Sequence, residues 1–280
     1  MEEYSEIEKL TIFKHLFKGR KDVFALHWQK ENKSGYMPAY QYDPYMYRLH
    51  KMKGGTFKDY KDKTFQPLTD QQLLKHLNGK QLIGIYPLLK DNTSCFIAAD
   101  FDKENWKEEC IGFLQSCENE NIPAYLERSR SGNGGHVWIF FDQPYPALKS
   151  RKILTTLLEK VRIFSVFDKS SSFDRLFPNQ DFHSGKGLGN LIALPLNKAA
   201  FEKGNSCFIN EEFQIYPDQW DFLQSIKRVS VSHLDAIYDQ LSLGIPKDLN
   251  TIHSDKLHIR LNNKVHLNRS GLSPIFSKTN

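Results

Sequence analysis

Between Ser94 and Leu196 the sequence alternates apolar strand-like runs with amphipathic helical stretches, and this order constrains the fold more than any other feature. The expected strands and helices cover residues 94–102, 105–120, 124–130, 136–142, 147–164 and 190–196. Their order, β-α-β-β-α-β, is that of split βαβ sheets of the RRM-like or ferredoxin-like kind. We therefore expect an α+β fold with the spatial strand order 4-1-3-2, in which the third and fourth strands run antiparallel to the first.

The central strands of this unit require cover on both faces. Phe96–Ala99 and Val137–Phe141 are apolar at every position, whereas the two helices can cover only one side of the sheet. We expect an N-terminal α/β part, residues 1–90, to cover the other side of a catalytic core at residues 91–225. Residues 226–280 are then expected to be a helical and hairpin region that leads toward a missing downstream module, with the hairpin at 257–267.

The first 90 residues give two clear patterns. A helix over Glu3–Phe17 is predicted from apolar residues at helical spacing, namely Ile7, Leu10, Phe13, Leu16 and Phe17. Asn32–Tyr60 is rich in tyrosine and turn residues, and five lysines lie among or just after its aromatic residues: Lys51, Lys53, Lys58, Lys61 and Lys63. The sequence favours a solvated, loosely ordered basic loop there over a nucleic-acid contact surface.

Composition narrows the class of protein. The chain has 280 residues, 40% of them hydrophobic, which suits one large or two small globular domains. A net charge of +5 permits a polyanionic partner without requiring one. The acidic start and the absence of a long apolar run predict a cytoplasmic protein without a membrane span. The four cysteines form no Cys-x-x-Cys pair, so we expect reduced core residues.

Acidic residues gather at one end of the predicted sheet. Asp100 and Asp102 end the first strand on one face, because side chains alternate along a strand. The expected topology brings the start of the third strand, His136, and the loop 168–189 to the same edge. That loop offers Asp168, Asp174 and Asp181 as a third carboxylate. Asp174 is favoured because Phe173 can anchor its backbone in the core, and Asp181 is the reserve.

The turn between the second and third strands is rich in glycine, Ser131-Gly-Asn-Gly-Gly135, and can bring backbone N–H groups close to a phosphate. Three carboxylates beside such a turn suit two-metal nucleotidyl transfer with Mg²⁺ or Mn²⁺. The expected catalytic and metal-binding residues are Asp100, Asp102 and Asp174. The expected nucleotide-binding residues are Arg130, Ser131, Gly132, Asn133, Gly134, His136, Arg175 and Lys186. A metal-dependent nuclease and a non-catalytic nucleic-acid-binding module remain alternatives.

Several motifs resemble the archaeo-eukaryotic primase superfamily, and most closely the primase-polymerase module of TOTE conflict systems. The short motifs are Ala99-Asp100-Phe-Asp102, Ser131-Gly-Asn-Gly-Gly-His136 and Phe173-Asp174. Longer matching stretches cover residues 16–20, 84–89, 127–141, 174–181, 187–196 and 218–220.

The resemblance implies a DNA primase-polymerase that acts on a single-stranded or primed DNA template with dNTPs or NTPs. It also implies that Asp100, Asp102 and Asp174 bind metal and that His136 contacts the incoming nucleotide. A helicase module or partner is a further implication, because residues 258–272 resemble the lead into one. The choice between dNTP and NTP, and between de novo priming and primer extension, stays open.

Overall fold

The computed structural model describes residues 4–161, 163, 171–185 and 187–243. Residues 1–238 form one compact unit and residues 239–280 another. The first unit contains all the strands of the described residues. Its helices are α1 (Glu6–Leu16), α2 (Pro44–Met52), α3 (Asp70–Leu77), α4 (Trp106–Asn119), α5 (Ala147–Lys160), α6 (Lys198–Phe201), α7 (Gln219–Ser225) and the start of α8 (Val231–Leu243). Its strands are β1 (Ala25–Lys30), β2 (Lys33–Pro38), β3 (Tyr40–Tyr42), β4 (Lys63–Phe65), β5 (Ile83–Ile85), β6 (Thr93–Asp102), β7 (Tyr125–Arg128), β8 (Gly134–Pro146), β9 (Phe173–Phe177), β10 (Ile192–Ala193) and β11 (Cys207–Phe208).

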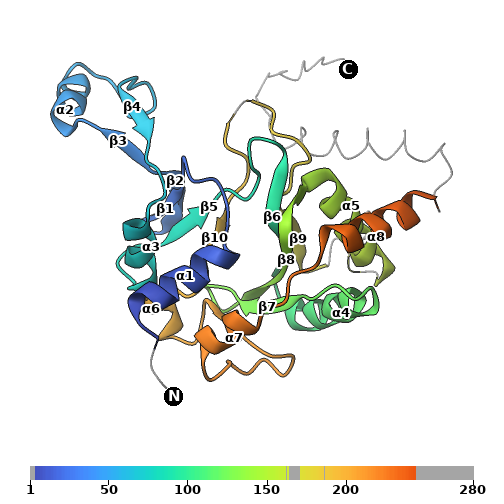
Figure 1. The fold of residues 1–280 in the computed structure, drawn as a ribbon. Coiled ribbons are helices and arrows are strands. Elements are labelled where there is room, and N and C mark those ends of the chain that lie inside the picture. The colour runs from blue at the N-terminus through green and yellow to red at the C-terminus, as the bar shows by residue number, and fades with distance from the viewer. Residues whose placement is uncertain (1–3, 162, 164–170, 186, 244–280) are drawn as a thin grey trace, which may run out of the picture. The chain divides into compact units, whose positions relative to one another are not determined.

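The larger sheet has the strand order β11-β7-β8-β6-β9, and each neighbouring pair is antiparallel. A second sheet has the order β10-β5-β1-β2, and β3 pairs with β4 separately (Figure 1). Helices and antiparallel sheets are thus combined in one unit, and the prediction of an α+β fold is confirmed.

The prediction of the fourth strand was wrong. The strand beside β6 is β9, whereas the segment expected at 190–196 contributes only β10, which pairs with β5 in the other sheet. Asp174 and Arg175 lie exposed in the middle of β9, so its sequence is typical of a loop. An edge strand tolerates such residues because one side of it faces solvent. Two residues after β10, Pro195 has no N–H group to extend the pairing.

The two faces of the larger sheet are covered by different parts of the chain. Phe101 in β6 packs against Phe113 of α4, with ring centroids 5.9 Å apart. On the other face, Trp138 of β8 packs against Phe17, just after α1, at 5.2 Å. Phe17, at the end of α1, thus lies on the second face of this sheet, the side where N-terminal cover was expected. Ile7 was expected on the buried side of α1, but its side chain is 78% exposed.

Residues 40–65, which we call the arm, are ordered rather than a loose loop, and that prediction was wrong. They comprise β3, α2 and β4, and α2 begins where the Asp43 carboxylate accepts hydrogen bonds from the N–H groups of Tyr45 and Met46. Asp followed by Pro at the first helical position is a recognisable helix start. Aromatic rings from the strands, the helix and the following loop pack together between them: Tyr40, Tyr42, Tyr47, Phe57 and Tyr60.

The expected helices near the end of the first unit are confirmed as α7 and α8. The hairpin expected at 257–267 lies outside the described residues. Within the part of the chain that the structure describes, no helix combines the length and the apolar character that crossing a membrane requires.

Phe13→Ala tests the packing of α1. Phe13 is 1% exposed and contacts Phe17 and the His76 ring, so its truncation should lower the free energy of unfolding by about 3–5 kcal/mol. Ile7→Ala on the same helix is the matched control and should change stability by less than about 0.5 kcal/mol, because the side chain is already exposed. Urea unfolding curves of both variants give the two values, and equal losses would contradict this placement of α1.

Candidate active site

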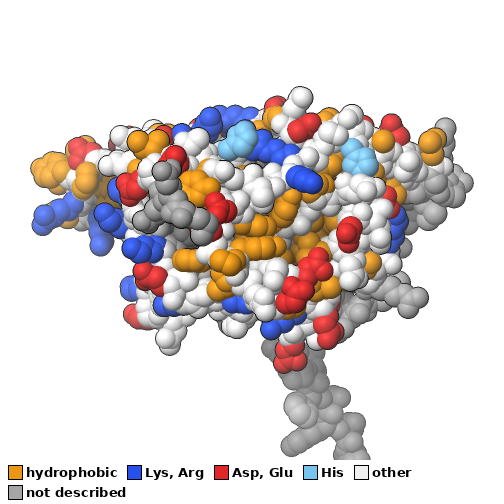
Figure 2. All heavy atoms as spheres, turned by 60° about the horizontal axis from the view of Figure 1, so that its bottom comes forward, with side chains coloured by type: hydrophobic (Ala, Val, Ile, Leu, Met, Phe, Trp, Pro, Cys, Tyr) orange, Lys and Arg blue, Asp and Glu red, His pale blue; other side chains and the backbone are white. Residues whose placement is uncertain are grey.

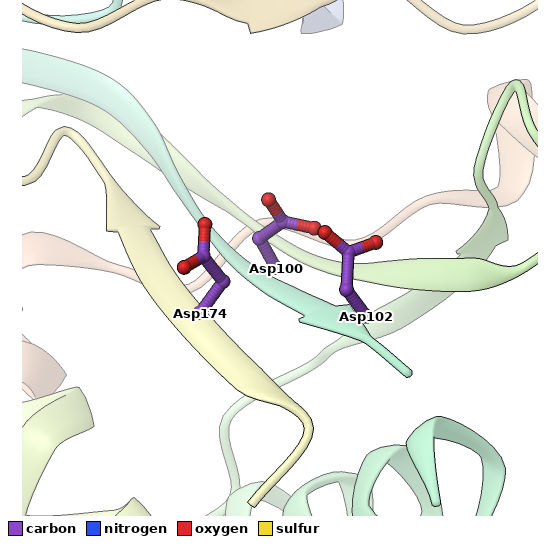
Figure 3. A group of neighbouring side chains, drawn as sticks. All are labelled: Asp100, Asp102 and Asp174. Atoms are coloured by element: carbon purple, nitrogen blue, oxygen red, sulfur yellow. The ribbon is translucent and has the colours of Figure 1, made fainter. Parts of the chain in front are cut away.

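Three carboxylates meet at the junction of β6 and β9. Asp100 and Asp102 lie at the end of β6, and Asp174 is the second residue of β9. One carboxylate oxygen from each side chain lies within 4.8 Å of the others, and Figure 3 shows the three groups converging above the strands. Asp100 is half-buried, whereas Asp102 and Asp174 are exposed. We call these three residues the acid cluster.

Strand register explains why these residues meet. Asp100 lies opposite Arg175, and Phe101 lies opposite Phe173, so Asp174 is an extra residue that interrupts the pairing of β6 with β9. Such a bulge bends the strand and redirects a side chain. The irregularity places the Asp174 carboxylate with those of Asp100 and Asp102, although the residue paired with Asp100 is Arg175.

The acid cluster carries concentrated negative charge. Partial burial raises the pKa of Asp102 above its ordinary value, and the charges of Asp100 and Asp174 raise it further. Arg175 offsets part of this charge, because its Nε lies 2.6 Å from Asp174 Oδ2. Three mutually repelling carboxylates are a site that a cation would stabilise.

His136 lies directly opposite Asp100 on the neighbouring strand β8. Its Nε2 is 3.4 Å from Asp100 Oδ1, and its Nδ1 is 2.9 Å from Oε2 of Glu127 on β7. Burial lowers the pKa of this ring, but the carboxylates of Glu127 and Asp100 outweigh that effect and raise the pKa well above its ordinary value. The ring is therefore held between two acids in its charged form.

The glycine turn (Ser131–Gly135) approaches the acid cluster closely. A Cβ on Gly134 would lie 2.6 Å from Asp102 Oδ1 and would also collide with the Phe101 carbonyl, so only glycine fits beside Asp102. Gly132 alone among the three glycines of this turn has a positive φ, +79°. The turn partly satisfies itself, because Gly132 N–H donates to Ser129 O and Asn133 N–H donates to Ser131 Oγ.

The remaining predicted nucleotide-binding residues differ in their exposure and in their partners. Ser131 and Asn133 are exposed in the glycine turn, and Arg130 is exposed beside it. Arg175 is exposed and paired with Asp174. Lys186 lies outside the described residues, as does Asp168.

Two charged residues near the site, the reserve acid and the arginine before Ser129, point elsewhere. Asp181, the reserve third acid, pairs with Arg151 of α5 at 2.6 Å. Arg128 donates hydrogen bonds to the carbonyls of Gly204 and Phe213, which leaves Arg130 as the other arginine of this strand end.

Sequence reasoning missed two acids that position the site. Glu127 is 2% exposed and accepts a hydrogen bond from Trp138 Nε1 at 2.7 Å in addition to its contact with His136. An acid next to Leu126 inside strand β7 was the available signal, since buried carboxylates need partners. Glu109 of α4 accepts hydrogen bonds from the N–H groups of Ser172 and Phe173, so it fixes the backbone just before Asp174. Nothing in the local sequence identifies that partner.

The acid cluster fits a hard divalent cation. Its donors are all carboxylate oxygens, which Mg²⁺ and Mn²⁺ prefer. Its residues come from β6 and β9, which are paired to each other, so the donor positions are tied to a common backbone framework. Ser172 O also accepts a hydrogen bond from Asp102 N–H, which joins the two acid-bearing segments directly.

The family comparison agrees with the sequence motifs. Residues 8–237 match the family described as "TOTE conflict system, Archaeo-Eukaryotic Primase domain". No curated protein sequence matches the chain. Among solved structures, the chain is similar to the polymerase domain of Ligase D from Mycobacterium tuberculosis in complex with DNA, with a TM-score of 0.41 and 11% sequence identity over 85% of this chain and 86% of that chain. The family match spans most of the sequence, and the chain therefore belongs to the archaeo-eukaryotic primase domain family of TOTE conflict systems.

Proposed function

We propose that the chain is a DNA primase-polymerase that joins nucleotides on a single-stranded or primed DNA template. The observation that carries this proposal is the acid cluster, whose three carboxylates lie within 4.8 Å in a chain of the primase domain family. The substrates are dNTPs or NTPs, and a helicase module or partner fits the resemblance of the C-terminal segment.

In this proposal Asp100, Asp102 and Asp174 hold two ions of Mg²⁺ or Mn²⁺. When bound, the ions would lower the pKa of the attacking 3′-hydroxyl and neutralise the leaving pyrophosphate. The protein's own contribution is to keep three acids together, at the cost of the desolvation and the repulsion that raise the pKa of Asp102. Arg175 partly screens Asp174 until the cluster is occupied.

His136 is proposed to contact the phosphates of the incoming nucleotide. Glu127 and Asp100 raise the pKa of its ring, and a charged ring donates a stronger hydrogen bond to phosphate than a neutral ring does. Because Nδ1 is held by Glu127, Nε2–H is the donor that would turn to the phosphate, in place of its longer 3.4 Å contact with Asp100 Oδ1. Glu127 also fixes the ring plane, because it contacts both His136 and Trp138. Arg130, Ser131 and Asn133 are exposed near the same strand end and would add further contacts.

We further propose that the catalytic sheet is a split βαβ unit. The order β6-α4-β7-β8-α5-β9 corresponds to a split βαβ unit once β9 replaces the expected fourth strand. In that unit the end of the first strand lies beside the start of the third and fourth. This topology supports the assignment of the strand end as the catalytic edge.

Asp174→Asn tests the third acid. The substitution keeps the size of the side chain but removes a charge that the cations need, so nucleotide incorporation should fall by at least about 100-fold, consistent with loss of about 2.7 kcal/mol or more of transition-state stabilisation. Asp181→Asn removes the same charge seven residues away, where the carboxylate binds Arg151, and should keep most of the activity. Primer extension with labelled nucleotides and Mn²⁺ measures both variants. Activity in Asp174→Asn together with its loss in Asp181→Asn would refute the assignment.

Asp102→Asn tests metal binding at the acid cluster without relying on activity. Without metal, the melting temperature of the variant should lie above that of the wild type by no more than about 4 °C, because the repulsion with Asp100 is relieved. Added Mn²⁺ should raise the melting temperature of the wild type by mass action and have a much smaller effect on the variant. Differential scanning fluorimetry in EDTA and in Mn²⁺ gives both readings. The same rise with Mn²⁺ in both proteins would show that the ion binds elsewhere.

A further inference from the structure

The arm (residues 40–65) is a structured extension of the N-terminal sheet rather than part of the catalytic sheet. β3 and β4 form its stem, α2 forms its tip, and Figure 1 shows it projecting from β1 and β2 on the side away from β6, β8 and β9. The aromatic cluster holds the stem and tip together, and Lys63 ties the loop by donating hydrogen bonds to the carbonyls of Phe57, Lys58 and Tyr60. The arm therefore presents its outer side chains on a fixed backbone.

The outer surface of the arm exposes apolar and aromatic side chains. No residue of α2 is buried, and Tyr45 and Met52 are 67% and 76% exposed. Tyr42 and Phe65 of the stem are also exposed, and an open groove at the root is lined by Tyr40, Tyr42 and Pro44. Side chains of this size are seldom left in water together on a short segment unless they have a partner.

Basic residues surround these side chains. Arg48, Lys51, Lys53, Lys58 and Lys61 are exposed, and none of them has an acidic partner among the described residues. Two of the three acids of the arm are engaged inside it, since Asp43 caps α2 and Asp59 pairs with His50. At the left end of Figure 2, hydrophobic and basic side chains lie next to each other over this part of the molecule.

We propose that the arm binds a single strand of nucleic acid, through lysine and arginine contacts to phosphates and stacking of bases on its exposed aromatic rings. Both features are needed for such binding: the cations follow the backbone, and aromatic faces accept any base. Acidic side chains alone would use the cations but offer no planar group to the rings, whereas every nucleotide supplies both a phosphate and a base. The proposal rests on the proposed function, in which the strand is the template.

The location of the arm sets the length of strand that it can contact. The arm projects away from the strands that carry the acid cluster, so a bound template must extend beyond the reacting end to reach it. An oligonucleotide bound only at the acid cluster should not contact the arm, whereas a longer strand that extends away from the cluster should.

The experiment measures binding of labelled single-stranded DNA by fluorescence anisotropy, in EDTA and without nucleotide. Two arm variants are compared with wild type. One is a double variant that carries Lys51→Gln and Lys53→Gln, and the other is the single variant Tyr45→Ala. The matched control is Lys198→Gln, Lys203→Gln, which removes two exposed lysines in and beside α6, at a distance from the arm (Figure 1). Circular dichroism and thermal melting check that every variant is folded.

With an oligonucleotide of about 16 nucleotides, the arm double variant should bind more weakly, and the slope of log K against log salt should become shallower by about 1.4. Tyr45→Ala should weaken binding by at least about fivefold, the lower end of the effect of one lost base stack. The control should match the wild type.

Equal weakening in the arm and control variants, or an unchanged salt slope, would overturn the proposal. Arm-dependent binding of anionic phosphatidylserine vesicles, without arm-dependent binding of oligonucleotides, would also overturn the proposal. Failure of the proposed function is a separate result: arm variants that lose DNA binding in a protein that never incorporates nucleotides leave the arm assignment intact. In the converse result, nucleotide incorporation depends on Asp174 while the arm variants bind DNA like the wild type. That pair of results rejects the arm proposal and leaves the proposed function intact.

Discussion

The antiparallel pairing of β6 with β8 on one side and β9 on the other is the constraint on which the site depends. It sets His136 opposite Asp100 and places Asp174, through a bulge, beside the end of β6. Gly134 then has to be glycine because any side chain would collide with Asp102. Backbone register, rather than flexible side chains or loops, thus determines the distances between the acids, and that is the rigidity that a metal site requires.

The same pairing also carries an electrostatic cost that the structure compensates locally. Three acids lie together at one edge, and a fourth, Glu127, is buried behind His136. The charged His136 ring stands between Glu127 and Asp100, and Arg175 pairs with Asp174. Glu109 stabilises the approach to β9 from α4 through the Ser172 and Phe173 amides. Glu127 and Glu109, which do not belong to the acid cluster, therefore hold the surroundings of the site in place through hydrogen bonds.

Much of this arrangement could be predicted from the sequence, because the central strands, the two helices and the convergence of Asp100, Asp102 and His136 follow from local periodicity and simple topology. The partner of β6 could not, since Asp174 and Arg175 make β9 look like a loop while Leu191 to Leu194 look like a strand. The arm was predicted wrongly for a related reason: its order comes from rings that pack across as many as 25 residues, from Tyr40 to Phe65, which no local pattern reveals. Glu127 and Glu109 act through contacts that only the folded chain provides.

The central claim is that the acid cluster is a divalent metal site, and diffraction from crystals grown with Mn²⁺ tests it most directly. Data collected at the manganese absorption edge should show at least one anomalous peak about 2.1 Å from carboxylate oxygens of Asp100, Asp102 and Asp174, the distance expected for such ions. The Arg175 contact with Asp174 should lengthen as the carboxylate turns to the metal. Absence of a peak at the cluster at saturating Mn²⁺, with Asp174 still paired to Arg175, would contradict the account.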